Sequence, residues 1–441
     1  MSFRPNGFAN KTSLLCAGLV LGLSISCSSA PLRPTAATDE GTGDGDGVNG
    51  GNGSGNGSGT GTGKDKDGTD TISGNGTGTN EPTNGGSGTV LPGTGTETGT
   101  DPGVDPVVTP KISLLFIGGS SSKIDVYKFN KSTGATALLK SNSTPGANPT
   151  FLAVHPKKKL LYAADETGST IMAFSIDPAS GVLKVLNSQP MPGGPAHVSV
   201  DPDGKFVFAA TYGSGHAASF PIASDGKIGT ATGDLFVGMN AHAVHMSPNK
   251  AQLWIPCLGS NYIAQYSFSA SGQWTPASPA TVPIGTGGPR HMASHPNGKW
   301  AYLMNELSSS VQALTYDGSS LKLNGTAVSA LSAPVGGNSG AEIQVHPAGK
   351  IVYSSNRGDN SIAIFSIAAN GEVSLQKTVK SGGKTPRHFA LDESGNWMTV
   401  ANQTGGVSVF SVNATSGDLT AKGSALSYDT AQYAEIFDFA E

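Results

Sequence analysis

The sequence predicts an all-β fold, a seven-bladed β-propeller, and two observations support this prediction. A strand–turn–strand pattern recurs along the chain, with its turns 46, 46, 48, 51 and 46 residues apart. The runs between the turns are short, alternating and bounded by Gly, Pro, Asn or Asp, and none has the 3.6-residue period of a long helix. Four strands in a unit of about 40–50 residues are typical of a propeller blade. The repeating turns are His155-Pro156, Asp201-Pro202, Ser247-Pro248, His295-Pro296, His346-Pro347 and Asp392-Glu393.

The two ends of the repeat region together supply the seventh blade. Six units are complete, and Ala434–Phe439 remains as one extra strand after the sixth. Before the first complete unit, three strands lack a leading partner: Ile112–Gly118, Lys123–Phe129 and Ala135–Lys140. Joining these segments in one blade closes the ring and leaves no exposed sheet edge. We therefore expect one domain, residues 111–441, closed by its C-terminal strand.

Residues 1–26 are predicted to be a signal peptide of the lipoprotein type. Two basic residues precede the apolar stretch Leu14–Ile25, which is too short to span a bilayer comfortably and is typical of an export signal. The run Leu23-Ser24-Ile25-Ser26-Cys27 resembles a bacterial lipoprotein signal, in which a small residue precedes the cysteine that receives the lipid. We expect lipidation at Cys27 and a chain anchored to a membrane of the cell envelope, periplasmic or surface-exposed. The alternative is a plain signal peptide with a chance cysteine.

Residues 27–110 are predicted to be a disordered tether. The segment 30–110 holds no Phe, Tyr or Trp, and 23 of the chain's 62 glycines lie between Gly41 and Gly103. Such a composition buries too little apolar surface to offset chain entropy. The tether dominates the composition, so the net charge of −4 says little about partners, and no basic patch indicates nucleic acid. We expect a monomer. Cys257 stands alone in a predicted strand and is expected to be a small core residue.

The arginines point to a functional site. From Lys111 to Glu441 the chain has three arginines and nineteen lysines. Each arginine lies in a repeat motif: Gly288-Pro289-Arg290-His291, Ser355-Asn356-Arg357-Gly358 and Thr385-Pro386-Arg387-His388. A planar, always-charged guanidinium can bind an anion in a way that lysine cannot. The use of lysine elsewhere therefore indicates that these positions need arginine.

Polar residues stand at the open end of the first hairpin in every unit, and a ring of blades brings those ends together around the channel. Counting outward from each hairpin turn places Arg290 opposite Glu306 and Glu342 opposite Arg357. The histidines of the His-Pro turns fall on the opposite rim and are expected to shape those turns. The residues expected to converge are Glu166, His197, Tyr212, His242, Arg290, His291, Glu306, Glu342, Arg357, Arg387 and His388.

These motifs resemble the seven-bladed β-propeller lactonase family, whose best-known activity is 6-phosphogluconolactonase and whose fold is shared with a fungal carboxy-cis,cis-muconate cyclase. The resemblance covers 111–441 and is carried by Asn148–Pro156, Gly194–Pro202, Gly288–His291, Asn305–Ser309, Ala341–Ile343, Ser355–Gly358 and Pro386–Asp392. In the cyclase a His, two Arg and a Glu form the proposed catalytic set. The resemblance places His242, Arg290, Arg357 and Glu306 in the corresponding motifs. Asn240, Ala196 and Thr211 depart from the family's usual His, Cys and Asn, which bears on the substrate more than on the fold.

Lactone opening requires a base that deprotonates water and a positive group beside the carbonyl oxygen. Neutral His242, oriented by Glu306, is the expected base. Arg290 and Arg357 are expected to stabilise the oxyanion or to clamp a carboxylate or phosphate, and Arg387 to bind a distal anionic end. The remaining residues expected to contact the substrate are His197, Tyr212, His291, Glu342, Glu166 and His388.

Two classes of function remain open at this stage. One is a cell-envelope hydrolase that opens a sugar lactone or a related cyclic ester; the other is a non-catalytic propeller that binds an anionic ligand or a protein partner on its arginine-rich face. 6-Phosphogluconolactone is a cytosolic metabolite, which an exported chain would not meet. Arg290 with Glu306 could also be a structural ion pair, and His197 and His242 could be ordinary channel histidines. We expect no cofactor; His and Glu around a channel could hold a metal, but no ligand spacing here is diagnostic of one.

Overall fold

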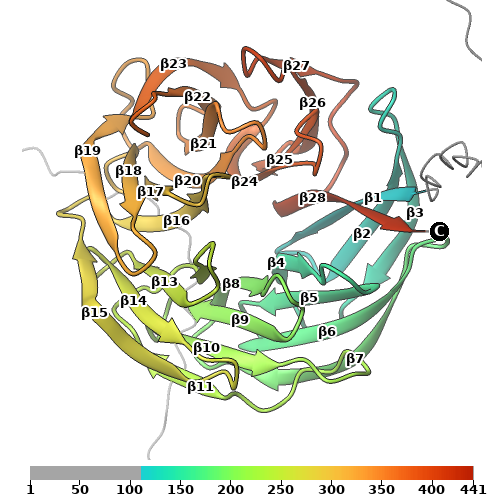
Figure 1. Cartoon of the computed structure of the whole chain (residues 1–441). Coiled ribbons are helices and arrows are strands. Elements are labelled where there is room, and N and C mark those ends of the chain that lie inside the picture. Colours follow the sequence, from blue (N-terminus) through green and yellow to red (C-terminus); the bar gives the residue numbers. More distant parts are fainter. Residues whose placement is uncertain (1–110, 441) are drawn as a thin grey trace, which may run out of the picture. The chain divides into compact units, whose positions relative to one another are not determined.

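The computed structural model describes residues 111–440, in which all 28 regular elements are β-strands. They form seven four-stranded antiparallel sheets, arranged as blades around a central channel (Figure 1). The predicted seven-bladed propeller is thus confirmed. The predicted signal peptide, the tether and Cys27 lie outside the described residues. The described residues contain no helix with the length and apolar character needed to span a membrane.

Within each blade the strands follow one another outward from the channel. Blade 1 consists of β28 (Ala431–Ala440), β1 (Lys111–Gly119), β2 (Lys123–Phe129) and β3 (Thr136–Ser143). Blade 2 consists of β4 (Pro149–Val154), β5 (Leu160–Asp165), β6 (Thr170–Asp177) and β7 (Val182–Pro190). Blade 3 consists of β8 (Pro195–Val200), β9 (Phe206–Thr211), β10 (His216–Pro221) and β11 (Gly233–Phe236). Blade 4 consists of β12 (His245–Met246), β13 (Gln252–Cys257), β14 (Tyr262–Phe268) and β15 (Trp274–Pro283).

The last three blades follow the same order. Blade 5 consists of β16 (Pro289–Ser294), β17 (Trp300–Asn305), β18 (Ser310–Tyr316) and β19 (Leu321–Ser329). Blade 6 consists of β20 (Ser339–Val345), β21 (Ile351–Arg357), β22 (Ser361–Ile367) and β23 (Val373–Lys380). Blade 7 consists of β24 (Lys384–Leu391), β25 (Trp397–Thr404), β26 (Gly406–Val412) and β27 (Leu419–Ala421).

The C-terminal strand closes the ring, as the sequence predicted. β28 pairs with β1 along its whole length, from Ala440 opposite Lys111 to Ala431 opposite Gly119. It is longer than the predicted Ala434–Phe439 and forms the channel-side strand of blade 1. The first and last residues of the propeller therefore share one sheet (Figure 1), which removes the unpaired edge of β1.

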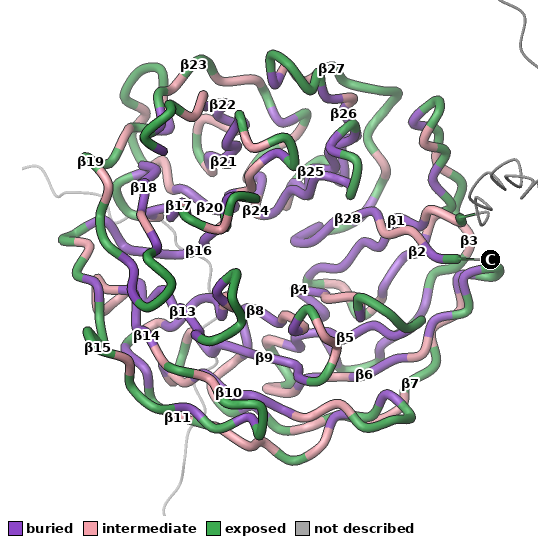
Figure 2. Tube along the Cα trace, in the orientation of Figure 1, coloured by how far each residue is buried: buried purple, intermediate pink, exposed green. Residues whose placement is uncertain are grey.

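The hydrophobic core lies between adjacent blades and follows from the two-residue period of each strand. In β1, Leu114 and Phe116 pack toward blade 2, while Leu115 and Ile117 pack toward blade 7, and all four are fully buried. Exposure rises outward: among strand residues, most of the exposed ones lie in the outermost strands, such as β7 and β19 (Figure 2). Cys257 is one of these core residues, and burial raises the pKa of its thiol to about 12.

The His-Pro turn histidines shape the turns and also join neighbouring blades. In blade 6, Nδ1 of His346 accepts a hydrogen bond from the Ala348 N–H at 3.1 Å, and its Nε2–H donates to the Gly395 carbonyl of blade 7, also at 3.1 Å. His155 and His295 form the same two kinds of bond, with Gly204 and Gly349 as their partners in the next blade. Their predicted role as turn formers is confirmed.

Candidate functional site

A β-bulge at the start of the channel-side strand directs consecutive side chains into the site. In blade 5, Pro289 pairs with Asn305 and His291 with Met304, so Arg290 is an extra residue without a direct cross-strand partner. A bulge breaks the in–out alternation of a strand and re-aims the side chains beside it. The same register shift occurs at the channel-side strands of blades 2, 3, 6 and 7. For this reason the sequence Pro-Arg-His can contribute both its arginine and its histidine to one site.

Most of the predicted site residues, together with Phe151 and Tyr433, form two layers across the channel. The first, which we call the arginine layer, consists of Arg290, Glu306, Arg357 and Arg387. The second, the imidazole layer, consists of Phe151, His197, His242, His291, Glu342, His388 and Tyr433. Because the members of each layer come from three or more blades, each layer forms only when those blades pack around the channel.

In the arginine layer one carboxylate is shared by two guanidinium groups. Glu306 Oε2 lies 3.0 Å from Arg290 Nε, and Glu306 Oε1 lies 2.8 Å from Arg357 Nη2. The Arg290 Nε–H is not aligned on that oxygen, so this contact is an ion pair without a hydrogen bond. Each arginine also donates to a backbone carbonyl of blade 6, Arg290 to Ala341 at 2.6 Å and Arg357 to Gly340 at 2.9 Å. The predicted Arg290–Glu306 pair is therefore present, with Arg357 as its third member.

The predicted opposition of Glu342 and Arg357 is wrong. The bulge in blade 6 spans Gly340 to Ile343, so the backbone of Arg357 pairs with Ser339 and not with Glu342. Arg357 consequently turns its side chain to Glu306, while Glu342 lies one layer deeper. A count outward from the turn cannot detect this change, because an extra residue in one strand shifts every pair beyond it.

In the imidazole layer a carboxylate and two histidines are hydrogen-bonded in series. Glu342 Oε2 lies 2.9 Å from His291 Nδ1, and His291 Nε2 lies 3.2 Å from His242 Nδ1. All three residues are at most 5% exposed. The expected orientation of His242 by Glu306 is therefore wrong: the described residue that holds the His242 ring is His291. The Tyr212 ring packs edge-on against His242, with their centroids 5.8 Å apart.

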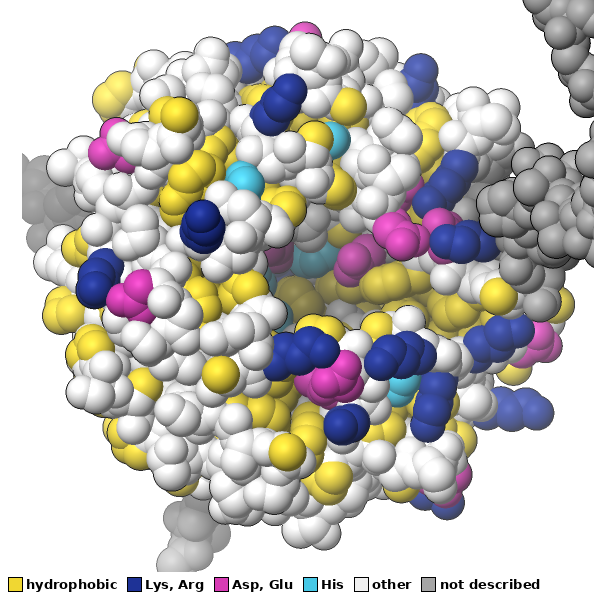
Figure 3. Space-filling view, viewed as in Figure 1, with side chains coloured by type: hydrophobic (Ala, Val, Ile, Leu, Met, Phe, Trp, Pro, Cys, Tyr) yellow, Lys and Arg dark blue, Asp and Glu magenta, His cyan; other side chains and the backbone are white. Residues whose placement is uncertain are grey.

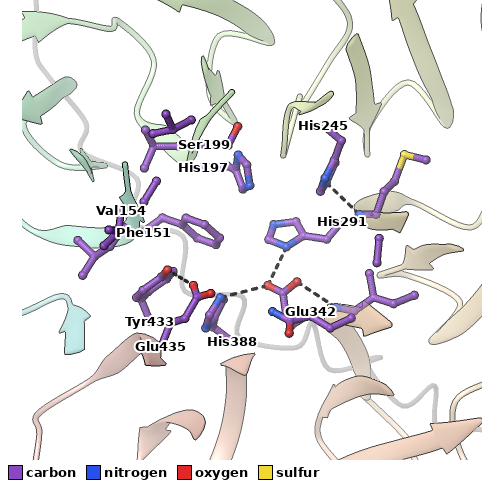
Figure 4. A pocket seen from close by; sticks show the side chains of 18 of the residues that line it. Phe151, Val154, His197, Ser199, His245, His291, Glu342, His388, Tyr433 and Glu435 are labelled. Carbon is purple, nitrogen blue, oxygen red and sulfur yellow. Dashed lines mark hydrogen bonds and ion pairs between the residues drawn. The ribbon is translucent and has the colours of Figure 1, made fainter. Parts of the chain in front are cut away.

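Aromatic rings fill the rest of this layer. The Phe151 ring contacts His197, His291, His388 and Tyr433, with centroids 4.5 to 5.8 Å apart. Figure 4 shows Phe151 and the imidazole rings of His197, His291 and His388 around the same central space. The sequence analysis missed Phe151, although it precedes its turn residue by the same four positions as His197 and His291 precede theirs.

Three further side chains, in or beside this layer, were also missed. Tyr433 and Glu435 come from β28, which has no following turn from which their register could be counted. His245, in β12, accepts a hydrogen bond from the Met292 N–H at 3.0 Å. The Tyr433 hydroxyl donates to Glu435, and its ring stacks on His388 with centroids 4.3 Å apart. The contacts of His245 with Met292 and of Tyr433 with His388 join neighbouring blades, so they leave no local signal in the sequence.

A cavity of about 410 Å³ lies on the side of the imidazole layer that faces the His-Pro turns. Its lining runs from His291 and Glu342 along the channel-side strands to Val154, Ser294 and Val345. Figure 3 shows a hollow at the centre of the ring with acidic and histidine side chains inside it. Arg290, Glu306 and Arg357 do not line this cavity. The imidazole layer thus separates it from the arginine layer.

Burial and neighbouring charge set the protonation of the site. Burial, followed by Arg290, holds the pKa of His242 well below its ordinary value, so its ring is neutral at pH 7. Burial and the nearby Arg357 lower the pKa of Arg290 to about 9, which leaves it charged at that pH. Burial by itself would raise the pKa of Glu306, but Arg357 and Arg290 outweigh it and hold the pKa below its ordinary value. Glu342 differs: burial raises its pKa.

Two predicted residues lie at the edge of the site. Arg387 is partly exposed and, among the described residues, forms no hydrogen bond or ion pair, although its charge acts on Glu306 and His242. Glu166 is partly exposed in the turn after β5 and forms no ion pair within residues 111–440. In that same range no three His, Cys, Asp or Glu residues cluster as metal ligands would.

Comparison with known proteins agrees with the fold and the motifs. The profile of the family described as "Lactonase, 7-bladed beta-propeller" matches residues 111–435. The 6-phosphogluconolactonase of Erwinia tasmaniensis is 33% identical over 287 residues, which cover 64% of this chain and 85% of that protein. The 6-phosphogluconolactonase of Serratia proteamaculans is 31% identical over 307 residues, which cover 68% of this chain and 91% of that protein.

Solved structures give the same result. The Pseudomonas aeruginosa periplasmic gluconolactonase superposes with a TM-score of 0.68 at 26% identity, covering 74% of this chain and 99% of that one. A crystal structure from Bacteroides fragilis superposes with a TM-score of 0.69 at 25% identity, covering 76% of this chain and 100% of that one. With its family profile, its relatives and its fold in agreement, the chain belongs to the seven-bladed β-propeller lactonase family, a family of lactone hydrolases.

Proposed function

We propose that this protein hydrolyses a lactone or related cyclic ester that carries an anionic group, and that it does so at the arginine layer. The observation that carries this proposal is the charge imbalance there: within residues 111–440, three guanidinium groups lie around the one carboxylate of Glu306. Arg387 has no ion-pair partner among the described residues, so its charge is available to a ligand. Uncompensated positive charge beside a neutral histidine is what ester hydrolysis requires, because negative charge develops on the carbonyl oxygen.

The proposed reaction uses the two layers together. His242 Nδ1 is engaged by His291, which leaves Nε2 of the ring to accept a proton from water. The water oxygen then attacks the lactone carbonyl carbon, and Arg290 and Arg357 stabilise the resulting oxyanion. When the ring C–O bond breaks, the leaving oxygen takes the proton back and the product is a hydroxy acid.

Arg387 binds the anionic end of the substrate, and Tyr212, packed on His242, borders the same space. Glu166, at the edge of the site, is kept as a proposed substrate contact. His197 and His388, in the imidazole layer, are kept as proposed contacts too.

The test is a panel of lactones, with and without a carboxylate or phosphate, added to the purified protein while released acid is titrated. Turnover of at least one lactone is expected. Arg387→Ala should raise KM for an anionic lactone roughly tenfold and leave the melting temperature unchanged, since the side chain has no partner to lose. His242→Gln should lower kcat by about 100-fold or more. Binding of the same lactones without acid release would instead identify a non-catalytic propeller, a reading that Asn240 in place of the family's usual histidine favours.

We also propose that the protein acts in the cell envelope. Two observations support this: the lipoprotein-like sequence that ends at Cys27, and the periplasmic gluconolactonase of Pseudomonas aeruginosa among its structural relatives. The favoured substrate class is then a sugar lactone whose anionic group is a carboxylate, because a phosphorylated sugar lactone is a cytosolic metabolite. Cell fractionation tests the location: Cys27→Ala should move the protein from the membrane to the soluble envelope fraction. Wild-type protein found in the cytosol would exclude it.

A further inference from the structure

We propose that His242, His291 and Glu342 form a reversible proton relay, in which Glu342 stores the proton that His242 takes from the attacking water. This inference rests on the proposed function for its chemistry. The relay itself rests on the geometry of the three side chains. It changes the expected roles of His291 and Glu342 from substrate contacts to positioning and proton-accepting residues.

The hydrogen-bond partners set the direction of the relay. Glu342 Oε1 accepts from the Ile343 N–H at 3.0 Å, so Oε2 is the oxygen that faces His291. An ionised carboxylate can only accept, so His291 carries its proton on Nδ1 and leaves Nε2 as an acceptor. His242 must then donate its Nδ1 proton to His291, and its own Nε2 keeps a free lone pair. The ionised carboxylate thereby fixes the tautomer of an imidazole two bonds away.

A second histidine supports the same orientation of the carboxylate. The Ala434 N–H donates to Nδ1 of His388 at 3.4 Å, so His388 carries its proton on Nε2. That nitrogen lies 3.8 Å from Glu342 Oε2, and its ring is held by stacking on Tyr433. Glu342 therefore faces N–H groups from two blades, as a proton-accepting carboxylate should.

The arginine layer makes such a relay necessary. If His242 alone held the transferred proton, a positive imidazolium would form in a buried position near Arg290, Arg357 and Arg387. In a relay, the proton arriving at His242 Nε2 is matched by transfer from His242 Nδ1 to His291 Nε2, and from His291 Nδ1 to Glu342 Oε2. One O–H bond of water breaks and one O–H bond forms on Glu342, so all three side chains end neutral. The reverse sequence returns the proton to the leaving ring oxygen.

The charged and titratable groups around the relay oppose an isolated positive charge more than they favour one. The groups whose charge acts on His242 and His291 are Arg290, Arg357, Arg387, His245 and His388. The groups whose charge acts on Glu342 are His388, Arg290 and His245. The charge of Glu342 acts in turn on Glu435 and Tyr433. Burial raises the pKa of Glu342 and so makes it a better proton acceptor than an exposed carboxylate.

Glu342→Gln tests the relay in the full protein, with Glu435→Gln as the matched control. Glutamine keeps the size of the side chain but cannot store a proton. Glu342→Gln should lower kcat by about 100-fold while KM changes less than threefold, and Glu342→Asp should recover part of the loss. Glu435→Gln, which changes a carboxylate in the same cavity, should keep wild-type kcat. If Glu342→Gln and Glu435→Gln behave alike on a lactone that the wild type hydrolyses, the relay is excluded while the proposed function stands.

Nitrogen NMR of ¹⁵N-histidine-labelled protein tests the relay without any substrate. In the wild type at pH 7, His242 and His291 should both carry their proton on Nδ1. Glu342→Gln should change both tautomers, because its amide N–H can donate to His291 Nδ1, whereas Glu435→Gln should change neither. Signals are assigned by replacing each histidine in turn. A proton on Nε2 of either ring in the wild type overturns the proposal, whether or not a substrate has been found.

Discussion

At the scale of single residues, the surroundings of a side chain decide its charge more than its type does. Glu306 and Glu342 are both nearly buried glutamates, yet two guanidinium groups lower the pKa of the first while burial raises that of the second. Even consecutive residues can lie in different surroundings: Arg290 belongs to the arginine layer and His291 to the imidazole layer. The site is therefore a stack of positive charge on neutral imidazole, and the proposed mechanism assigns anion binding to the first and proton transfer to the second.

Glu435 provides a pH-dependent prediction at this scale. Burial raises its pKa from 4.5 in the unfolded chain to about 7, although the Tyr433 hydroxyl hydrogen-bonds the ionised form. Between these two values the folded state binds more protons than the unfolded state, so stability falls as pH rises through this window and levels off above about 7. Glu435→Gln removes this contribution. Its free energy of unfolding, relative to the wild type, should therefore be higher at pH 8 than at pH 5 by roughly 1–3 kcal/mol.

Urea unfolding of both proteins at the two pH values measures this difference. Other groups titrate equally in the wild type and in Glu435→Gln. The difference between the two proteins in free energy of unfolding therefore reports the contribution of Glu435 alone. An equal difference at pH 5 and pH 8 would show that the carboxyl is ionised at no cost in the folded protein.

At the scale of elements, the channel-side strands carry a functional end and a structural end. The bulge at the start of the strand directs residues into the two layers, while the turn after it joins neighbouring blades through histidines such as His346. Asp201 occupies the same position in blade 3 and accepts hydrogen bonds from the N–H groups of Asp203, Lys205 and Phe206 within its own turn. Aspartate thus shapes the turn locally, and histidine also reaches the next blade.

This difference predicts a graded series at His346. His346→Ala loses both hydrogen bonds and leaves the buried Gly395 carbonyl without its donor, so it should destabilise the protein by about 1–3 kcal/mol. His346→Asp should restore the bond within the turn and recover part of that loss. Thermal unfolding with a lactone assay at 25 °C separates the effects, because this turn lies on the rim away from the arginine layer. Equal stability of the alanine and aspartate variants would contradict the assigned bonds.

At the scale of the whole molecule, β28 closes the ring and lines part of the cavity. It covers the edge of β1 and places Tyr433 and Glu435 beside the imidazole layer. Its buried residues also fill the core on both sides, Phe439 with blade 2 and Ile436 with blade 7. A seven-bladed ring has no other strand to replace it.

Removing residues from Tyr433 onward should therefore unfold or aggregate the protein. The truncation removes three large buried apolar side chains, those of Tyr433, Ile436 and Phe439. Burial of each contributes about 1.5–3 kcal/mol, so their loss approaches the whole stability of a domain, about 5–15 kcal/mol. Circular dichroism melting and size-exclusion chromatography measure the result. Removal of only Ala440 onward, which deletes one paired residue of β28, is the matched control and should melt near the wild type. A shortened protein that melts like this control would show that the ring closes without β28.

The sequence by itself determined the number of blades, the closure of the ring and most residues of the two layers. These are local properties: the spacing of the turns, and polar residues beside Arg290, Arg357 and Arg387. The ends add a blade without its leading strand at the start of the repeat and one extra strand after its last unit. Phe151 was also within its reach, since it shares its distance from the turn with His197 and His291. The predicted Arg290–Glu306 ion pair is present because the long arginine side chain reaches the carboxylate, although the bulge leaves Arg290 without a partner in the strand register.

Only the tertiary structure decided which residues meet. The bulge that turns Arg357 from Glu342 to Glu306 depends on how two strands pair, and one extra residue changes every pair beyond it. The contact between His242 and His291 joins blades 4 and 5, and that between His291 and Glu342 joins blades 5 and 6. Such contacts form only when neighbouring blades pack together, because no single blade contains both partners. The sequence therefore specifies which residues belong to the site, and the packing of seven blades around one channel specifies which of them contact each other.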